Sequence, residues 1–400
     1  MSVSLINKVK YSPLILKLYR LAGNTFVSIL RKFISVDPNK IMFVCFGGRQ
    51  YGDSPKCIYE QMLRDKRFEK ANYCWAFIEP SKHEIFKGEK VKVDTFSYYY
   101  NLFKSNVWVT NSGVERGLTF KPKGRYYIDT WHGSALKCGG VDSPEGNEAF
   151  GTIQDSTGET WCAQSEFDLH HLSRAYCVPE ENFILVGMPR NDELVANNND
   201  AYKQGIKKKL NIPPDKRVIL YAPTYREYLR DNDNNCIIAP PINIEKLKNE
   251  LGDKYVFLFR CHYEVVKSMN MVEDDFCRNL SSYPSVNDLM IISDILISDY
   301  SSIFSDFSIL EKPMLCFTYD YDEYLRKRGL YYDIREELKS WISTEDELIA
   351  ELKDLNIEYR IDIAKGFKSI HAQAFGDSTI KVVDSIYNGM QSTKYYKKTI

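Results

Sequence analysis

Short apolar runs that end in polar or glycine residues recur along most of the chain. From residue 40 onward they alternate with amphipathic segments such as Pro55–Phe68, which the spacing predicts as a helix. A first series of predicted strands comprises Ile41–Phe46, Tyr73–Ile78, Asn106–Thr110, Arg125–Thr130 and Phe183–Val186. A second series comprises Val218–Tyr221, Tyr255–Phe259, Ile295–Ser298 and Met314–Phe317. This alternation is typical of parallel sheets with helices on both faces, so the predicted fold class is α/β.

Turn-forming residues separate the two series. The segment Gly187-Met188-Pro189-Arg190-Asn191-Asp192 interrupts the apolar pattern, and 400 residues are more than one hydrophobic core usually organises. We therefore expect two Rossmann-like domains that face each other across a cleft, an N-terminal one over 39–187 and a C-terminal one over 188–375. Residues 376–400 are expected to form a C-terminal helix and a basic tail.

The first 38 residues form a third, basic and amphipathic segment. Apolar residues fall at helical spacing after Pro13 and again after Asn24, which predicts a pair of helices. No acid opposes the cations before Asp37; they are Lys8, Lys10, Lys17, Arg20, Arg31 and Lys32. Such helices can lie on an anionic membrane face or pack on the chain's own core. The basic-aromatic tail Lys394–Lys398 favours the membrane, and we expect a peripheral protein on the cytoplasmic face.

The composition limits the kinds of molecule that the protein is expected to bind. Lys and Arg total 53 against 54 for Asp and Glu, so the net charge gives no reason to expect nucleic acid. Apolar residues make up 44% and charged residues 27%, as in soluble globular proteins. No apolar stretch approaches the roughly 18 residues that span a bilayer, and the N-terminus lacks a signal-peptide core. The ten cysteines are scattered without zinc spacing, as expected in a reducing cytoplasm.

The change from apolar to hydroxyl side chains after residue 297 is the clearest candidate for chemistry. The apolar run Ile291–Ile297 resembles a buried strand, and Asp299, Ser301 and Ser302 follow at its end. A strand that leads into a helix start presents free backbone N–H groups, to which the two serines add donors. We expect a phosphate site here, although an ordinary N-cap would look the same.

Three further strand ends carry polar side chains. His132-Gly133 follows the strand that ends near Thr130, with a helix expected after it, and histidine suits proton transfer near neutral pH. The other two ends carry Thr224 with Arg226, and Arg260 with His262. Carboxyl ends of parallel strands meet at one sheet edge. Two arginines, a histidine, a threonine and a serine pair at such an edge predict a diphosphate site.

Two other motifs carry less information. The turn Phe46–Ser54 contains Gly47 and Gly48 but has neither P-loop nor dinucleotide spacing, so it indicates only a backbone that a ligand can approach closely. Asp320-Tyr321-Asp322 resembles a metal-binding acid pair but has no further ligands nearby in the sequence. We therefore predict no metal site and no required cofactor; a divalent cation is compatible with the sequence but not indicated by it.

Taken together, these motifs resemble the CDP-glycerol glycerophosphotransferases of teichoic acid and capsule synthesis. The resemblance covers roughly residues 40–380 and rests on Tyr51–Pro55, Thr130–Gly133, Gly187–Asp192, Tyr221–Arg226, Arg260–His262, Ser298–Ser302 and Arg328–Tyr331. The chain departs from the usual family pattern at Tyr225, Cys261 and Ser134-Ala135, none of which carries chemistry in our interpretation. The resemblance implies a GT-B architecture and a peripheral membrane enzyme.

The resemblance also implies roles for the candidate residues. His132 would act as the general base on an acceptor hydroxyl, with His262 as a second catalytic histidine beside the diphosphate. The donor-binding group would comprise Thr224, Arg226, Arg260, Asp299, Ser301 and Ser302. The acceptor side would comprise Gly47, Gly48, Asp53 and Gly133. The implied reaction moves a polyol phosphate, glycerol phosphate above all, from a CDP-polyol to a cell-wall or capsule acceptor and releases CMP.

Several alternatives stay open at this point. CDP-ribitol could replace CDP-glycerol, because the longer polyol changes the shape of the pocket rather than the motifs. A GT-B glycosyltransferase that uses a nucleotide sugar would share the fold and the phosphate-binding edge but would release a nucleoside diphosphate. A membrane-bound scaffold would bind without turnover. The sequence does not distinguish a lipid-linked acceptor from a polymeric one, or a single addition from polymerisation.

Overall fold

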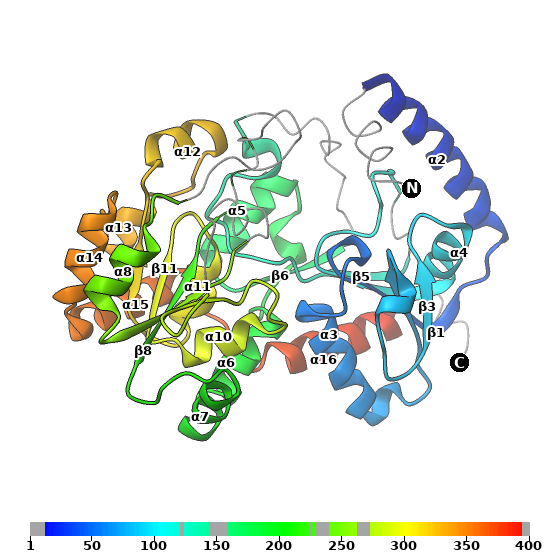
Figure 1. Ribbon diagram of the computed structural model, residues 1–400. Coiled ribbons are helices and arrows are strands. Elements are labelled where there is room, and N and C mark those ends of the chain that lie inside the picture. The colour runs from blue at the N-terminus through cyan, green and yellow to red at the C-terminus, as the bar shows by residue number, and fades with distance from the viewer. Residues whose placement is uncertain are drawn as a thin grey trace. The chain divides into compact units, whose positions relative to one another are not determined.

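The computed structural model describes residues 13–120, 124–144, 159–224, 226, 228, 240–261 and 273–393 (Figure 1). The chain divides into two compact units. Unit 1 comprises Met1–His132, Gly139–Asp192 and Asp377–Ile400, and unit 2 comprises Gly133–Cys138 and Glu193–Gly376. The division thus lies after Asp192, where the sequence analysis placed it after residue 187. The chain also crosses between the units around residues 133–138 and again at Asp377.

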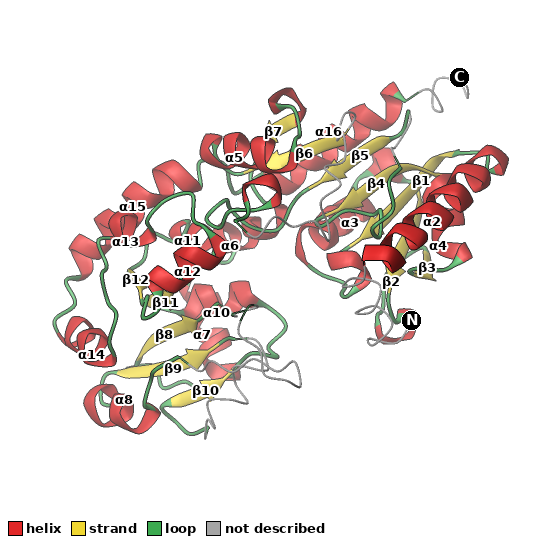
Figure 2. Cartoon of the chain, turned by 90° about the horizontal axis from the view of Figure 1, so that it is seen from above, coloured by secondary structure: helices red, strands yellow, loops and turns green. Residues whose placement is uncertain are grey.

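Unit 1 is built on a parallel sheet of seven strands in the order β3-β2-β1-β4-β5-β6-β7. The strands are β1 Asp37–Val44, β2 Asn72–Phe77, β3 Glu89–Lys92, β4 Ser105–Thr110, β5 Tyr126–Asp129, β6 Glu159–Ala163 and β7 Phe183–Leu185. The central strand β4 is buried along its whole length, as a strand covered on both faces must be. Figure 2 shows the strands of each sheet in yellow.

Helices cover both faces of this sheet. They are α2 Pro13–Phe33, α3 Asp53–Arg64, α4 Phe96–Lys104, α5 Glu166–Tyr176 and α16 Ser378–Ser392. Short 3-10 helices lie at Phe46–Gly48, Lys66–Phe68, Pro80–Lys82, Gly140–Asp142, Glu180–Asn182 and Pro189–Asn191. Although α16 lies at the far end of the chain, Val382, Val383 and Ile386 complete one of the two hydrophobic clusters of unit 1. The predicted C-terminal helix therefore packs on the sheet of unit 1, where its apolar side chains are buried.

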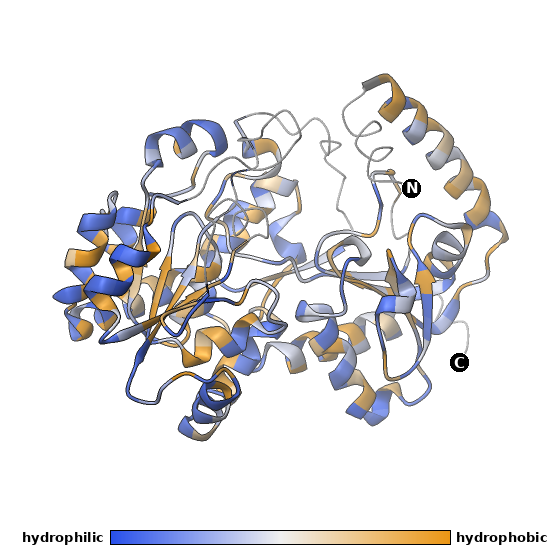
Figure 3. Cartoon of the chain, in the orientation of Figure 1, coloured by the Kyte–Doolittle hydropathy of each residue, from blue (hydrophilic) through white to orange (hydrophobic). Residues whose placement is uncertain are grey.

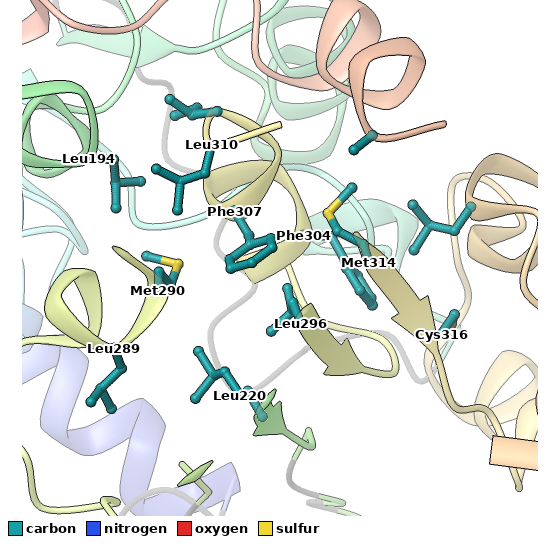
Figure 4. Close-up of a cluster of buried hydrophobic side chains, with 14 of the residues drawn as sticks. Leu194, Leu220, Leu289, Met290, Leu296, Phe304, Phe307, Leu310, Met314 and Cys316 are labelled. Carbon is teal, nitrogen blue, oxygen red and sulfur yellow. The ribbon is translucent and has the colours of Figure 1, made fainter. Parts of the chain in front are cut away.

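Unit 2 is built on a second parallel sheet, in the order β10-β9-β8-β11-β12. Its strands are β8 Arg217–Ala222, β9 Tyr255–Phe259, β10 Cys277–Asn279, β11 Ile295–Ser298 and β12 Met314–Cys316. Its helices are α6 Asp192–Ala196, α7 Asp200–Lys209, α8 Ile244–Leu251, α10 Val286–Ile292, α11 Ile303–Ser308, α12 Tyr321–Arg328, α13 Ile334–Leu338, α14 Glu345–Lys353 and α15 Ile357–His371. In its larger core, Phe304 and Phe307 of α11 pack with Leu296 of β11 and Leu220 of β8 (Figure 4).

The predicted α/β fold with parallel sheets is confirmed. The nine strands predicted from apolar runs all occur, and most end within two residues of the predicted position. The sequence analysis missed three strands, β3, β6 and β10. Two of these, β3 and β10, lie at sheet edges, where only one face or part of the strand is buried and polar residues interrupt the apolar run.

Three local predictions were wrong. The N-terminal helix pair is one continuous helix, because Asn24 does not cap a second helix: its Nδ2 and Oδ1 bond to Thr119 Oγ1 and N instead, at 2.7 and 2.8 Å. The expected helix after His132 is absent from 130–139, because the backbone there bonds to 329–331 within unit 2. Ile291 and Ile292 end helix α10 rather than begin strand β11.

Helix α2 carries an apolar face that is exposed among the described residues of unit 1. The large exposed residues are Leu14, Ile15, Leu18, Leu21, Phe26, Ile29 and Phe33. Val27, on the other side, is buried in the cluster that includes α4. Figure 3 colours much of α2 orange, for hydrophobic. Among the helices of the described residues, none is long and apolar enough to cross a membrane.

Candidate active site

His132 is fixed by a backbone carbonyl. It follows β5 through Trp131, whose φ of 52° turns the chain away from the strand direction. Its Nδ1 lies 2.6 Å from the carbonyl oxygen of Asn111, in the loop after β4. Because a carbonyl oxygen only accepts, this bond requires a proton on Nδ1. Neutral His132 therefore keeps its lone pair on Nε2, the arrangement that a general base needs.

Asp129 holds together the two loops that make this contact. Its carboxylate accepts from the Trp131 N–H at 2.8 Å and from the Gly113 N–H at 3.0 Å. Burial raises the pKa of Asp129 to about 6, although both backbone bonds lower it. Nearby, burial raises the pKa of Glu115 to about 7. Two buried carboxyl groups with raised pKa values therefore lie in the part of unit 1 that holds the His132 loop.

The glycine turn at the end of β1 joins the same assembly. Gly47 and Gly48 have φ of 61° and 88°, and the Gly47 N–H lies 3.1 Å from Ser112 Oγ. The Asn111 side chain accepts from the Phe46 N–H at 2.8 Å. The loops after β1, β4 and β5 are therefore bonded to one another at one edge of the unit 1 sheet.

Arg190 connects Asp53 to His132. Its Nη1 lies 2.9 Å from Asp53 Oδ2 and 3.0 Å from the carbonyl oxygen of His132. Both side chains of the ion pair are about nine-tenths buried, so the pair is shielded from solvent. Of the predicted site residues, the structure brings Gly47, Gly48, Asp53 and His132 together in unit 1.

In unit 2, Asp299 organises the ends of β8 and β11. Its Oδ1 accepts from the Thr224 N–H at 2.8 Å and from the Tyr300 N–H at 2.7 Å. Ser301 Oγ accepts from the Ile303 N–H at 3.3 Å, at the start of α11. The hydroxyl turn predicted from the sequence is thus present, and it is tied to the neighbouring strand end through one carboxylate.

Gly133 approaches this hydroxyl turn closely. A Cβ atom at Gly133 would lie 2.5 Å from Ser302 Oγ and 3.2 Å from Ser302 Cβ. The sequence analysis placed Gly133 on the acceptor side with His132, yet its packing belongs to unit 2. Because Gly133 follows His132 directly in the chain, the residue that carries the candidate base is covalently joined to a segment that packs on Ser302.

Two arginines at the unit 2 strand ends have different surroundings. Arg226 is fully buried and pairs with Asp299 and Asp320. Arg260 is half-buried, and its Nη1 donates to the carbonyl oxygens of Leu280 and Tyr283 at 3.1 and 2.7 Å. Burial lowers the pKa of Arg260, and no carboxylate among the described residues offsets this effect. Arg260 is therefore held by neutral groups and keeps a charge available for an anion.

Some functional candidates lie elsewhere or were missed. His262 lies outside the described residues. The sequence analysis did not single out Asn111, and it considered Asp320 only as a weak metal ligand; Asp320 instead binds Arg226. Within the described part of the chain, no three His, Cys, Asp or Glu side chains gather as a metal site would require. Asn111 contacts His132 through its backbone carbonyl, so no property of its side chain could have identified this contact.

The sequence profile of the CDP-glycerol:poly(glycerophosphate) glycerophosphotransferases matches residues 25–388. The chain belongs to this family. The resemblance inferred from the motifs is thereby confirmed, over more of the chain than the motifs themselves cover.

Curated relatives include enzymes of teichoic acid synthesis. The chain is 34% identical over 343 residues to the teichoic acid glycerol-phosphate transferase of Staphylococcus aureus, covering 81% of this chain and 86% of that protein. It is 35% identical over 337 residues to the teichoic acid poly(glycerol phosphate) polymerase of Staphylococcus epidermidis. That match covers 80% of this chain but only 46% of the polymerase, so the chain spans about half the length of this relative.

Solved structures show the same fold. The wall teichoic acid polymerase TagF matches with a TM-score of 0.80 and 30% identity, covering 98% of this chain and 99% of that one. A TagF variant soaked with CDPG matches equally well. A UDP-N-acetylglucosamine 2-epimerase from Listeria monocytogenes matches with a TM-score of 0.57 and 11% identity, over 89% of this chain and 97% of that one, which is a likeness of fold alone.

Proposed function

We propose that this family member transfers glycerol phosphate from CDP-glycerol to a hydroxyl group of a teichoic acid or capsule acceptor and releases CMP. The observation that carries the proposal is the bond between His132 Nδ1 and the Asn111 carbonyl, which leaves Nε2 as a proton acceptor. Family membership supplies the donor class. The structures of TagF with CDPG support the same donor.

The proposed reaction has one displacement at phosphorus. His132 Nε2 takes the proton of the acceptor hydroxyl while that oxygen attacks the β-phosphorus of CDP-glycerol. The bond from the β-phosphorus to the bridging oxygen breaks, and that oxygen leaves with its electron pair as part of CMP. The protein contributes positioning and charge stabilisation, which is most of what phosphoryl transfer requires.

Unit 2 would hold the donor diphosphate. Ser301 and Ser302 offer hydroxyl groups, and Thr224 lies at the adjoining strand end. Arg260 offers a cation whose position is set by two carbonyl groups. His262 is assigned to the same group from the sequence alone. Donors held in place before the reaction stabilise developing charge without reorganisation.

The proposal also includes the class of acceptor and an association with the membrane. We infer a lipid-linked or polymeric acceptor with a polyol-phosphate or glycan end. The exposed apolar face of α2, together with the exposed Lys17 and Lys32 of the same helix, matches what an anionic membrane surface binds. The protein would then work as a peripheral enzyme on the cytoplasmic face, beside its lipid-linked substrate.

CDP-ribitol is the second candidate donor. The teichoic acid poly(ribitol-phosphate) polymerase of Bacillus spizizenii is 35% identical over 193 residues, or 46% of this chain and 30% of that protein. Two glycerol-phosphate relatives cover 81% and 94% of this chain, which favours CDP-glycerol. A nucleotide-sugar donor would instead release a nucleoside diphosphate.

The test is nucleotide release by purified protein given CDP-glycerol, CDP-ribitol or a panel of UDP- and GDP-sugars, with membrane lipid as acceptor. We expect CMP from CDP-glycerol and a fall of about 10²- to 10⁴-fold in rate for His132→Ala, the usual contribution of a general base. His170→Ala is the matched control, because His170 is exposed and its ion pair with Glu180 is likewise exposed to solvent. Normal turnover by His132→Ala would overturn the assignment of the base. A nucleoside diphosphate from a sugar donor would overturn the proposed reaction.

A further inference from the structure

Arg226 is the most deeply buried charged side chain beside the proposed donor site. Its side chain is 1% exposed, and each of its three nitrogens has a protein partner. Nε and Nη2 lie 2.7 and 2.9 Å from the two oxygens of Asp320, a bidentate pair. Nη1 lies 2.9 Å from Asp299 Oδ2 and 2.6 Å from the Thr224 carbonyl oxygen. All three nitrogens of the guanidinium therefore already contact protein groups.

Aromatic rings enclose this ion cluster. The guanidinium carbon lies 5.0, 5.4 and 4.9 Å from the ring centres of Tyr300, Tyr319 and Tyr324. The Tyr300 hydroxyl donates to Asp320 at 3.0 Å, and the Tyr300 ring stacks on that of Tyr324 at 3.8 Å. Rings of this kind stabilise a cation and exclude water, which strengthens every charge interaction inside.

The charge balance argues against direct contact between Arg226 and the donor. One guanidinium faces two carboxylates, so the cluster already carries more negative than positive charge. Burial disfavours the charge of Arg226, but Asp299 and Asp320 outweigh this effect and raise its pKa. A diphosphate that drew Arg226 away would leave two buried carboxylates without a cation, which is strongly unfavourable.

We propose that Arg226 is a positioning residue that acts on the donor site through Asp299 and Asp320, rather than a ligand of the donor. Asp299 is the link, because its other oxygen accepts from the Thr224 and Tyr300 N–H groups. Asp320 directly precedes α12, so the bidentate pair also joins that helix to the ends of β8 and β11. The inference rests on the proposed function, which places the diphosphate at Thr224, Ser301 and Ser302.

A double-mutant cycle tests the proposal. Arg226→Met, Asp320→Asn and the double variant are compared by equilibrium binding of CDP-glycerol and by KM and kcat. If Arg226 acts through its carboxylates, both single variants weaken binding, on the order of ten-fold, and the double variant is no weaker than the worse single one. If Arg226 contacts the donor, Asp320→Asn frees the guanidinium and leaves binding equal or tighter. That result would overturn the proposal.

A matched control distinguishes the proposed positioning role of Arg226 from a purely structural role. Arg360 is also buried in unit 2, where it binds Glu351 and the carbonyl oxygens of Leu338 and Lys339. Arg360→Met should lower the melting temperature without changing KM, whereas the Arg226 variants should raise KM. Melting temperatures lowered in all variants with KM unchanged would also overturn the proposal.

Two further measurements complete the test. Arg226→Lys keeps the charge but loses the bidentate geometry, so its affinity for CDP-glycerol should lie between those of the wild type and Arg226→Met. If Arg226→Met does not fold, the comparison uses Arg226→Lys and Asp320→Asn instead. Wild-type protein that fails to bind CDP-glycerol would overturn the proposed function and this inference together. Normal wild-type binding with unchanged variants would overturn this inference alone.

Discussion

The two units hold their polar groups by different means, although each is a parallel sheet covered by helices. Unit 1 fixes His132 with neutral backbone groups and leaves Asp129 and Glu115 buried without a cation among their described partners. Unit 2 fixes its hydroxyl turn through a carboxylate, Asp299, that pairs with a buried arginine. The first arrangement suits a group that must change its protonation state, and the second suits groups that must stay in place beside a constant negative charge.

The difference also affects stability. A buried carboxyl group without a nearby cation is more stable in its protonated form. The free energy of unfolding of unit 1 should therefore depend on pH near neutrality. The stability of unit 2 depends on a buried ion pair. Removing one partner of such a pair is strongly destabilising, because the other charge stays buried without compensation. The following predictions test this contrast, from the largest expected effect to the smallest.

Glu115→Gln should remove much of the pH dependence of unit 1. Burial raises the pKa of Glu115 from 4.5 to about 7, so the folded protein holds more protons than the unfolded chain between these values. Stability should therefore fall as pH rises from about 4.5 to about 7, by about 3 kcal/mol for this one group. The measurement is the free energy of urea unfolding against pH. Glu84→Gln is the control, because Glu84 is 93% exposed. Parallel curves for wild type and Glu115→Gln would contradict the prediction.

Gly48→Ala should destabilise unit 1 by roughly 2 to 3 kcal/mol. The φ of 88° disfavours any side chain, and the new Cβ would lie 3.2 Å from both the Ile78 N and Phe77 Cα atoms. Chemical denaturation measures the loss. Gly205→Ala is the comparison, because Gly205 lies in helix α7 and no atom within 4 Å would meet its Cβ. Equal stability of the two variants would show that the glycine turn is not strained.

Gly133→Ala should reduce turnover on the order of ten-fold, about 1.4 kcal/mol in the barrier, with little effect on stability. The new methyl group would press on Ser302, yet the backbone at Gly133 is not left-handed. The turn that carries Ser301 and Ser302 would have to move, while the fold stays intact. Steady-state kinetics and a melting curve measure the two effects. A lowered melting temperature with unchanged turnover would contradict this account.

Asp384→Asn should cost less than about 1 kcal/mol. Asp384 lies on α16 and pairs with Arg67 at 2.6 Å, but both side chains are substantially exposed and Arg67 also binds Asp65. The free energy of unfolding at low and high salt measures the effect. A cost of several kcal/mol would mean that this ion pair, rather than the apolar face of α16, attaches the helix to unit 1.

The sequence predicted the central strands well because burial on both faces produces a continuous apolar run, as in β4, β8 and β9. It missed β3 and β10 because edge strands are short and partly polar. It also misplaced a helix after His132, where long-range pairing with 329–331 overrides local preference. The family and its chemistry were recognisable because the motifs occur together and in order.

The candidate site was predicted less completely. Strand-end position predicted His132 and Ser301 as site residues, since parallel strands place their carboxyl ends along one edge. The roles of Asn111 and Asp320 were not predictable, because they depend on residues far away in the sequence. The sequence predicted Arg226 as a phosphate ligand, whereas its burial among carboxylates and rings supports the positioning role that we propose.

The sequence by itself determined the α/β class, the positions of most strands and the family, because these follow from local apolar patterns and short motifs. The tertiary structure decided which nitrogen of His132 bonds to the Asn111 carbonyl, which arginine pairs with buried carboxylates, and that α16 completes one of the hydrophobic clusters of unit 1. Each of these depends on contacts between distant segments. Local patterns record the burial of a residue but not the identity of its partner.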